Sequence, residues 1–261
     1  MRKSKSLINK IWFSLISGII VIVTFIISIN YNLFNLFGGM PSLQDLEKPE
    51  SELSSELYSS DNKLLGKYFR YNRSPVKFNE LSDQLVTTLL VTEDIRFYDH
   101  SGIDLKGLIR ASYGVGKNIL TFGASGLEGG GSTITQQLAK NLFKIRREKK
   151  GKLSGVPFLG LVISKVKEWI VAVKLEQFYT KKEILAMYLN TAEYGSNSYG
   201  IKVASKTYFN KLPSELNYNE SSIIVGLLNK PTKYNPYFNP ENAKKKRAEI
   251  FYNLFKYKII D

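Results

Sequence analysis

The sequence predicts a mainly helical fold with one small β-hairpin, preceded by a single transmembrane helix. Three observations predict this class: an uncharged apolar run near the N-terminus, two β-type segments on either side of a Ser-Asp-Asn turn, and helical periodicity from Ser82 almost to the C-terminus. With 261 residues, of which 43% are hydrophobic and 23% charged, the chain has the composition of a folded protein.

The composition also excludes several classes of function. The chain has no cysteine, which rules out disulfide frameworks, thiolate metal sites and cysteine nucleophiles, and a single histidine argues against a zinc site. The formal net charge of +14 indicates an anionic partner, such as nucleic acid, anionic lipid or phosphate.

The first predicted element is the uncharged run at residues 12–29. As a helix it is about 27 Å long at about 1.5 Å per residue, close to the ~30 Å hydrocarbon core of a bilayer. Before the first acidic residue, Asp45, the only charged residues are Arg2, Lys3, Lys5 and Lys10. The positive-inside tendency then leaves residues 40–261 outside the cytoplasm. A signal peptide is the alternative, although no clear cleavage site follows the run.

We therefore expect a cytoplasmic basic tail at residues 1–10, a membrane anchor at 11–30, a juxtamembrane linker at 31–55 and one extracytoplasmic domain at 56–261. Gly, Pro, Ser and acidic residues in "GGMPSLQDLEKPESELSS" indicate the linker, and "ELYSSDNKLLGKYFRYN" predicts the hairpin. For such a protein, phospholipid or lipid-linked phosphate is a better anionic partner than nucleic acid.

The segment "LSDQLVTTLLVTED" predicts an amphipathic helix. At about 100° per residue, its apolar stripe contains Leu85, Val86, Leu89 and Leu90. Glu93 projects onto the middle of this stripe, whereas Asp94 falls away from it. A carboxylate on a buried face loses hydration, which raises its pKa unless cations or hydrogen-bond donors compensate. The alternative is that the helix ends by Thr92 and that Glu93 is solvated.

A glycine-rich segment, "GASGLEGGGSTITQQLAKNLF", leads into the next predicted helix. Thr133 to Gln136 fits the capping-box pattern, and the helix places Gln137, Lys140 and Asn141 on one side. A glycine-rich loop at a helix N-terminus, with a lysine two turns in, is suited to holding an anion or a sugar. It matches neither the nucleotide P-loop nor the dinucleotide motif. A flexible loop entering a surface helix is the alternative.

The segment "SKVKEWIVAVKLEQFYTKKEILAMYLN" predicts two consecutive helices. The main core stripe of the first is expected to contain Val166, Trp169, Ile170 and Val173. Glu168 lies on the opposite side, as a second acid on a largely apolar surface, and Lys167 and Lys174 share a third side. An ordinary exposed glutamate is the alternative reading of Glu168. Thr180 and Glu183 form a capping box for the second helix.

Two glutamates facing a common interior, a glycine-rich loop, several lysines and a membrane anchor together indicate acid/base chemistry on an anionic, membrane-held substrate. At these same residues the sequence resembles the peptidoglycan glycosyltransferase family. The segments "EDIRFYDHSGID", "GGSTITQQLAKNLF", "KVKEWIVAVKLE", "KKEILAMYLNTAEYG" and, more loosely, "RAEIFYNLF" resemble the five motifs of that family in order. The family contains monofunctional polymerases and the N-terminal half of class A penicillin-binding proteins, and the resemblance runs from about Pro41 to the C-terminus.

The resemblance implies a lysozyme-like helical fold that acts on lipid II and on the growing lipid-linked glycan strand. It makes Glu93 the base that deprotonates the C4 hydroxyl of the acceptor N-acetylglucosamine. The C4 oxygen then attacks C1 of the donor N-acetylmuramic acid, which inverts the α-linked diphosphate into a β-1,4 bond and releases undecaprenyl diphosphate. Base catalysis contributes ~10²- to 10⁴-fold, so alignment and stabilisation of the diphosphate must supply the rest.

The resemblance also assigns roles to further residues. Glu168 matches the second essential glutamate, which supports the donor side or helps to position a divalent cation, Mg²⁺ or Mn²⁺; no organic cofactor is implied. Asp94 joins the catalytic group as a support of the base, and Lys140 contacts the phosphate. His100 is expected to be structural rather than a proton carrier. The other substrate-binding positions, together with His100, are Phe97, Ser132, Thr133, Gln136, Gln137, Asn141, Lys165 and Lys167.

This sequence departs from the family pattern before Glu168. The family usually has Arg-Lys four and three residues before this glutamate, where this chain has Ser164 and Lys165. Our hypothesis is that Arg146 or Arg147 replaces the missing arginine, and polymerisation that survived alanine at both positions would refute it. Between Phe143 and Ser164 the chain also looks longer than is usual in the family. In this region, "VPFLGLVI" is expected either to dip into the membrane or to form a buried turn.

Several alternatives stay open at this point. No Lys-Thr-Gly or Ser-x-Asn set occurs, so we expect no transpeptidase domain, in either a monofunctional polymerase or a fragment of a bifunctional protein. One alternative function is that of a glycan-cleaving lysozyme or lytic transglycosylase. The other alternative is a non-catalytic cell-wall scaffold. The expected location is the cytoplasmic membrane of a bacterium, with other cell-wall synthesis proteins as possible partners and no nucleic acid.

Overall fold

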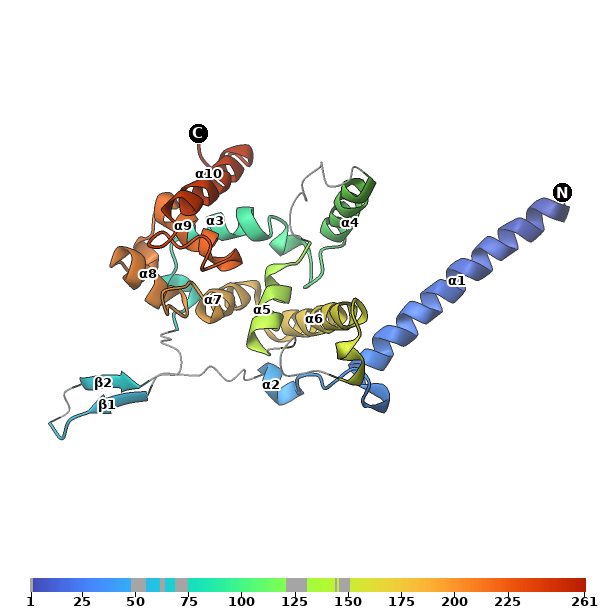
Figure 1. The fold of residues 1–261 in the computed structure, drawn as a ribbon, viewed down its shortest axis with the longest axis horizontal. Helices are drawn as coiled ribbons and strands as arrows, with labels where there is room; N and C mark the ends of the chain where they lie inside the picture. Colours follow the sequence, from blue (N-terminus) through green and yellow to red (C-terminus); the bar gives the residue numbers. More distant parts are fainter. Residues whose placement is uncertain are drawn as a thin grey trace.

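The computed structural model describes residues 2–47, 55–61, 64–68, 75–120, 131–143, 145 and 151–261, and this part of the chain is mainly helical (Figure 1). Its N-terminal half contains α1 (Arg2–Asn30), η1 (Leu33–Asn35), α2 (Leu43–Glu47), β1 (Ser55–Tyr58), β2 (Leu64–Tyr68), η2 (Phe78–Glu80), α3 (Asp83–Glu93), η3 (Phe97–Asp99) and α4 (Leu105–Leu120). Its C-terminal half contains α5 (Ile134–Leu142), η4 (Lys152–Gly155), α6 (Leu159–Phe178), α7 (Lys181–Thr191), α8 (Ile201–Phe209), η5 (Pro213–Glu215), α9 (Tyr218–Asn229) and α10 (Pro240–Lys256). The predicted fold class, mainly α with a small hairpin, is confirmed.

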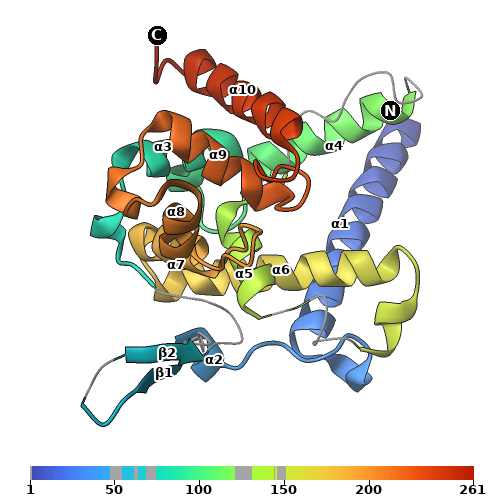
Figure 2. The same cartoon turned by 60° about the vertical axis from the view of Figure 1, so that its left-hand side comes forward.

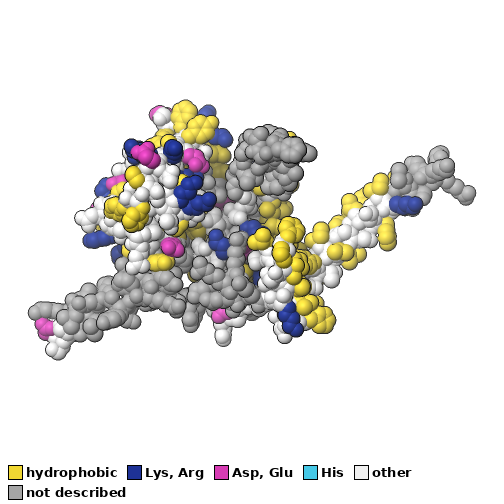
Figure 3. Space-filling view, in the orientation of Figure 1, with side chains coloured by type: hydrophobic (Ala, Val, Ile, Leu, Met, Phe, Trp, Pro, Cys, Tyr) yellow, Lys and Arg dark blue, Asp and Glu magenta, His cyan; other side chains and the backbone are white. Residues whose placement is uncertain are grey.

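Helix α1 projects away from the rest of the molecule (Figures 1 and 2). Its segment Ile8–Asn30 is, within the described residues, the one helix that is long and apolar enough to cross a membrane. Hydrophobic side chains are exposed along this segment and around its junction with the body (Figure 3). An exposed apolar helix of this length agrees with the predicted anchor.

The segment after α1 was predicted to be a linker, but much of it is folded onto the body. The Phe37 ring packs edge-on against Phe25, with ring centroids 6.0 Å apart. Leu46 in α2 is fully buried, and its carbonyl accepts a hydrogen bond from the Tyr179 hydroxyl at 2.8 Å. Apolar side chains at these positions explain the difference, because a Gly- and Ser-rich composition does not reveal where single large residues dock.

The predicted hairpin is present as the antiparallel pair β1 and β2. Ser55 pairs with Tyr68 and Glu56 with Lys67, and the register shifts between Leu57 and Tyr58. The hairpin extends to one side of the helical body, away from α1 (Figure 1).

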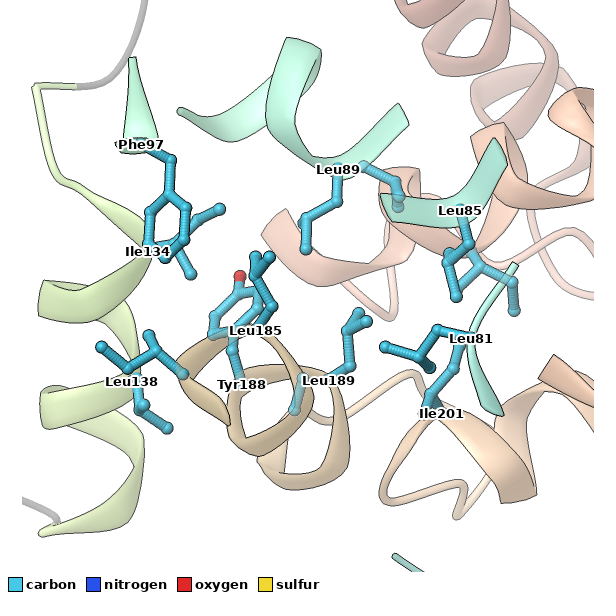
Figure 4. Packing of buried hydrophobic residues seen from close by; sticks show 14 of the residues in the cluster. Leu81, Leu85, Leu89, Phe97, Ile134, Leu138, Leu185, Tyr188, Leu189 and Ile201 are labelled. Carbon is cyan, nitrogen blue, oxygen red and sulfur yellow. The ribbon is translucent and has the colours of Figure 1, made fainter. Parts of the chain in front are cut away.

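The core lies between two groups of helices. Helix α3 packs against α9 and α10, and α5 packs against α6 and α7. The interior between these groups is filled by side chains such as Leu85, Leu89, Ile134, Leu138, Leu185 and Leu189 (Figure 4). Leu85 and Leu89 are fully buried, so the predicted apolar stripe of α3 does face the core.

Helix α6 is buried on a different side from the one predicted. The most buried positions in its C-terminal half are Val171, Ala172 and Leu175, which include the side assigned to Glu168. The predicted stripe instead faces the end of α1, where Val166 packs with Ile29 and the partly buried Trp169. The sequence pattern was ambiguous because α6 is apolar on two sides and contacts a different partner on each.

Candidate active site

Glu93 is the last residue of α3, and its carboxylate is held by two amides. Ser82 caps the start of this helix by accepting a hydrogen bond from the Leu85 backbone. At the other end, the Gln137 amide donates to Oε2 of Glu93 at 2.9 Å and the Asn229 amide donates to Oε1 at 2.7 Å. The side chain is partly buried, so the alternative reading of a helix that ends earlier with a solvated glutamate is wrong.

The surroundings of Glu93 raise its pKa. Burial is the largest cause, because removing water disfavours the charged carboxylate. The amides of Gln137 and Asn229 and the positive charges of Lys246 and Lys140 act in the opposite direction. The balance leaves a carboxyl group that is easier to protonate than an ordinary glutamate, which is the property of a general base that must accept a proton.

Asp94 is turned away from Glu93 and joins a different group of contacts. Its Oδ2 accepts the backbone N–H of Ile134 at 3.0 Å, at the start of α5, where the helix dipole favours a negative charge. Both of its oxygens lie 3.1 Å from Nε2 of His100, and both side chains are buried. Asp94 and His100 therefore connect the start of α5 to the end of α3, and their role as supports of the base stays a prediction.

The predicted cap of α5 is confirmed in one half and differs in the other. The Thr133 hydroxyl accepts the backbone N–H of Gln136 at 3.2 Å. The Gln136 side chain does not complete the box, because its amide donates to the Gly102 carbonyl at 3.0 Å, and the Thr133 hydroxyl donates to that carbonyl at 2.8 Å. Gly102 has a φ of +88°, and a Cβ there would lie 2.8 Å from the carbonyl carbon of Ala172. The loop after His100 thus requires glycine where it crosses α6.

Glu168 is buried and lies with two other predicted site residues. Glu168 is only 1% exposed, so the alternative that it is an ordinary exposed glutamate is wrong. Lys165 lies one turn earlier on α6, with its ammonium 3.1 Å from Oε2 of Glu168 and 2.5 Å from the Ser132 hydroxyl. Ser132 immediately precedes the cap of α5, so this group adjoins the contacts of Thr133.

A further network of contacts joins the loop that contains His100 to the end of α6. The Lys181 ammonium donates to the His100 carbonyl at 2.6 Å and to Glu176 at 2.9 Å, and it lies 4.2 Å from the centroid of the Phe97 ring. The Thr135 hydroxyl donates to Glu176 at 2.6 Å. Phe97 is fully buried in this arrangement, which supports the loop that carries His100.

Not every predicted site residue joins these groups. The Lys167 ammonium donates to the Gly39 carbonyl at 3.3 Å, on the side of α6 that faces the end of α1. Asn141 is exposed on α5, whereas the partly buried Lys140 before it acts on Glu93 through its charge. Arg146 and Arg147, the proposed substitutes for the missing arginine, lie outside the described residues.

Sequence reasoning missed two residues next to Glu93 and Gln137, namely Tyr188 and Asn229. Tyr188 is a buried residue of α7 whose hydroxyl donates to Oε1 of Gln137 at 2.8 Å. A buried tyrosine hydroxyl needs a partner, which is the signal that was available. Asn229 ends α9 just before the Lys-Pro pair that stops the helix, and only the packing of α9 on α3 brings it to Glu93.

The residues around Glu168 do not form a cation site by themselves. Mg²⁺ and Mn²⁺ prefer carboxylate, carbonyl and water oxygens. Among the described residues there is no group of three or more His, Cys, Asp or Glu side chains able to hold a metal ion, and the Lys165 ammonium occupies one side of Glu168. The divalent cation stays a prediction, and we derive no step through it.

Comparison with known proteins agrees with these motifs. A family model described as "Transglycosylase" matches residues 61–255, which include all of the groups above. Penicillin-binding protein 1A of Neisseria flavescens is 36% identical over 215 residues, covering 82% of this chain and 25% of that protein. Penicillin-binding protein 1A of Vibrio cholerae is 32% identical over 246 residues, covering 94% of this chain and 28% of that protein.

The chain therefore spans about a quarter of the length of these relatives. Among solved structures, a crystal structure of penicillin-binding protein 1A from Haemophilus influenzae aligns with 81% of this chain and 19% of that chain, with a TM-score of 0.41 and 21% identity. Since the family model covers most of the chain and ends close to its C-terminus, the chain belongs to the transglycosylase family.

Proposed function

We propose that this chain is a peptidoglycan glycosyltransferase that polymerises lipid II into β-1,4-linked glycan strands for the bacterial cell wall. The observation that carries the proposal is the carboxylate of Glu93, partly buried at the end of α3 and held by two neutral amides inside a transglycosylase domain. Membership of the family supplies the reaction class, and the geometry supplies a base.

In the proposed reaction, Glu93 accepts the proton of the acceptor C4 hydroxyl as the C4 oxygen forms its bond to C1 of the donor. The bond from C1 to the diphosphate oxygen breaks, its electron pair leaves with undecaprenyl diphosphate, and the configuration at C1 inverts. A base whose pKa is raised toward the working pH accepts the proton more readily. We assign stabilisation of the phosphate charge to Lys140, whose positive charge lies close enough to the proposed base to act on Glu93.

The donor side is assigned to Glu168 and its neighbours. Lys165 neutralises the buried Glu168 and reaches the Ser132 hydroxyl, so it links α6 to the start of α5. A buried carboxylate is retained at low cost only when it is paired in this way. We propose that this group orients the sugar diphosphate.

We further propose that α1 is the single membrane span and that the catalytic domain lies on the extracytoplasmic side. The basic residues at the start of α1 support the side, and two exposed apolar side chains near α1 support contact of the body with lipid: Phe34 in η1 is 85% exposed and Phe158, just before α6, is 80% exposed. Leu161 is exposed as well, whereas Ile163 at the end of "VPFLGLVI" is buried, so residues 156–163 do not form the wholly buried turn that was the alternative. Exposed aromatic and aliphatic groups next to a span are suited to the lipid interface.

The function is tested by incubating the full chain, in detergent or vesicles, with labelled lipid II. We expect glycan strands and free undecaprenyl diphosphate from the wild type. Glu93→Gln keeps the shape of the side chain but has one acceptor oxygen instead of two and cannot take the proton, so we expect polymerisation to fall by ~10²-fold or more. Glu168→Gln is expected to reduce activity as well, because it leaves Lys165 without its carboxylate.

Three outcomes would contradict the proposal. Cleavage of preformed glycan without polymerisation of lipid II would identify a lysozyme-like hydrolase. Chain formation that survived Glu93→Gln would remove Glu93 from the mechanism, and a wild type inactive on lipid II alongside an active relative would favour a scaffold.

A further inference from the structure

Asn229 lies beside the proposed base although 136 residues separate it from Glu93 in sequence. Helices α3 and α9 pack against each other, Glu93 is the last residue of α3, and Asn229 is the last residue of α9. The Asn229 amide donates to Oε1 of Glu93 at 2.7 Å, a short hydrogen bond to a carboxylate. The contact thus depends on both helices ending at the same place.

The other oxygen of Glu93 is held from the opposite side. Gln137 on α5 donates to Oε2, and the Tyr188 hydroxyl on α7 donates to the carbonyl oxygen of the same Gln137 amide. Burial raises the pKa of Tyr188 well above its ordinary value, and the charge of Glu93 adds to this effect, so the hydroxyl keeps its proton. Turning the Gln137 amide over would place its oxygen against the Glu93 carboxylate. The orientation of this amide is therefore fixed.

We propose that Asn229 is a positioning residue for Glu93, holding one carboxylate oxygen while the Tyr188–Gln137 pair holds the other. The inference rests on the proposed role of Glu93 as the base. Each carboxylate oxygen has two acceptor positions. One amide on each oxygen fixes the rotation of the carboxylate and leaves a position free for the acceptor hydroxyl.

The environment of Glu93 allows the effect of Asn229 to be separated from that of its neighbours. The charged or titratable groups that act on Glu93 are Lys140 on α5, Lys246 on α10 and Tyr188 on α7, and all remain when Asn229 is changed. Asn229 is exposed, so replacing its side chain removes little buried surface from the fold. A change in the titration of Glu93 would therefore report the lost amide.

The experiment measures kcat and KM for lipid II across pH in the full-length protein carrying Asn229→Ala or Asn229→Asp. For the alanine variant we expect kcat to fall about tenfold, KM to stay within about twofold, and the acidic limb of the profile to move up by about one pH unit, because a hydrogen bond to a charged group changes its equilibrium by roughly that factor. Aspartate has the shape of asparagine but cannot donate when ionised and repels Glu93, so its loss is expected to be at least as large.

Asn239→Ala is the matched control. Asn239 is a partly buried asparagine ten residues further on, whose amide donates to the Thr232 carbonyl at 3.1 Å, and its variant is expected to keep the wild-type profile. Wild-type kcat and pH profile in Asn229→Ala, with Glu93→Gln inactive, would refute the role of Asn229 alone. A fall in kcat by the same factor at every pH would also refute it. Activity in Glu93→Gln would instead refute the proposed base.

Discussion

Two adjacent acids at the end of α3 have different surroundings because the backbone changes direction between them. Glu93 is the last helical residue and stays on the face that packs toward α5 and α9. Asp94 is the helix C-cap, with φ −159° and ψ 74°, and this conformation turns its carboxylate toward the Ile134 N–H and His100. One residue step thus separates a carboxylate held by neutral amides from one that binds a helix N-terminus.

The raised pKa of Glu93 predicts that the site weakens the fold at neutral pH. A carboxyl group whose pKa is higher in the folded than in the unfolded chain contributes stability below its unfolded pKa, and this contribution is lost as the pH rises through the folded pKa. Glu93→Gln is therefore expected to raise the free energy of unfolding at pH 7 by on the order of 1 kcal/mol. Urea unfolding of both proteins at pH 7 and pH 4 measures this difference in the free energy of unfolding, and we expect the difference to be smaller at pH 4.

Glu241→Gln serves as the comparison for this measurement. Glu241 is exposed at the start of α10, next to Lys244, and surface changes of this kind alter stability by less than about 0.5 kcal/mol. A Glu93→Gln protein less stable than wild type at pH 7 would show that the amide contacts outweigh the burial of the charge.

At the scale of elements, the start of α5 is the junction of the site. Ser132 contacts Lys165 of α6, Thr133 contacts the Gly102 carbonyl, and the Ile134 N–H contacts Asp94. Three successive residues thus bind three separate parts of the chain. A displacement of this helix end disturbs both glutamate groups at once.

Gly102→Ala tests this junction. A methyl group there has no room beside Ala172, and φ of +88° is strained for alanine, so we expect destabilisation of about 2–4 kcal/mol and a clearly lower Tm. Gly155→Ala is the control, because nothing lies within 4 Å of a Cβ at that position. Equal melting temperatures for the two variants would show that the loop moves freely away from α6.

Local patterns predicted the elements better than their partners. The stripe of α3, the Thr133 cap and the Thr180–Glu183 capping box follow from residues within one or two turns, and all are present. The prediction of which face of α6 packs in the core was wrong. The predicted face is covered by the end of α1 instead, which periodicity within α6 cannot reveal. The Asn229 contact was missed for the same reason, since it depends on how α9 packs on α3.

At the scale of the whole molecule, the orientation across the membrane is a prediction that the chain itself makes simple to test. The chain contains no cysteine, so a single introduced cysteine is the only thiol in this protein that a maleimide can label. In intact bacterial cells we expect a membrane-impermeant maleimide to label Ser214→Cys, on an exposed residue of η5, and to label Ser6→Cys only after lysis. Labelling of Ser6→Cys in intact cells would reverse the proposed topology.

The docking of α1 on α6 has a consequence for how the reaction is placed over the bilayer. Ile29 of α1 is buried with Ile163 and Val166 of α6, and the Lys174 ammonium reaches the Asn30 side chain at 3.3 Å. Val166 is two residues from Glu168, so α1 packs directly on the helix that carries one of the two site glutamates. We therefore expect a tilt of α1, as in a thinner bilayer, to move Glu168 with it, so that the height of the proposed donor site above the lipid depends on the bilayer as well as on the protein.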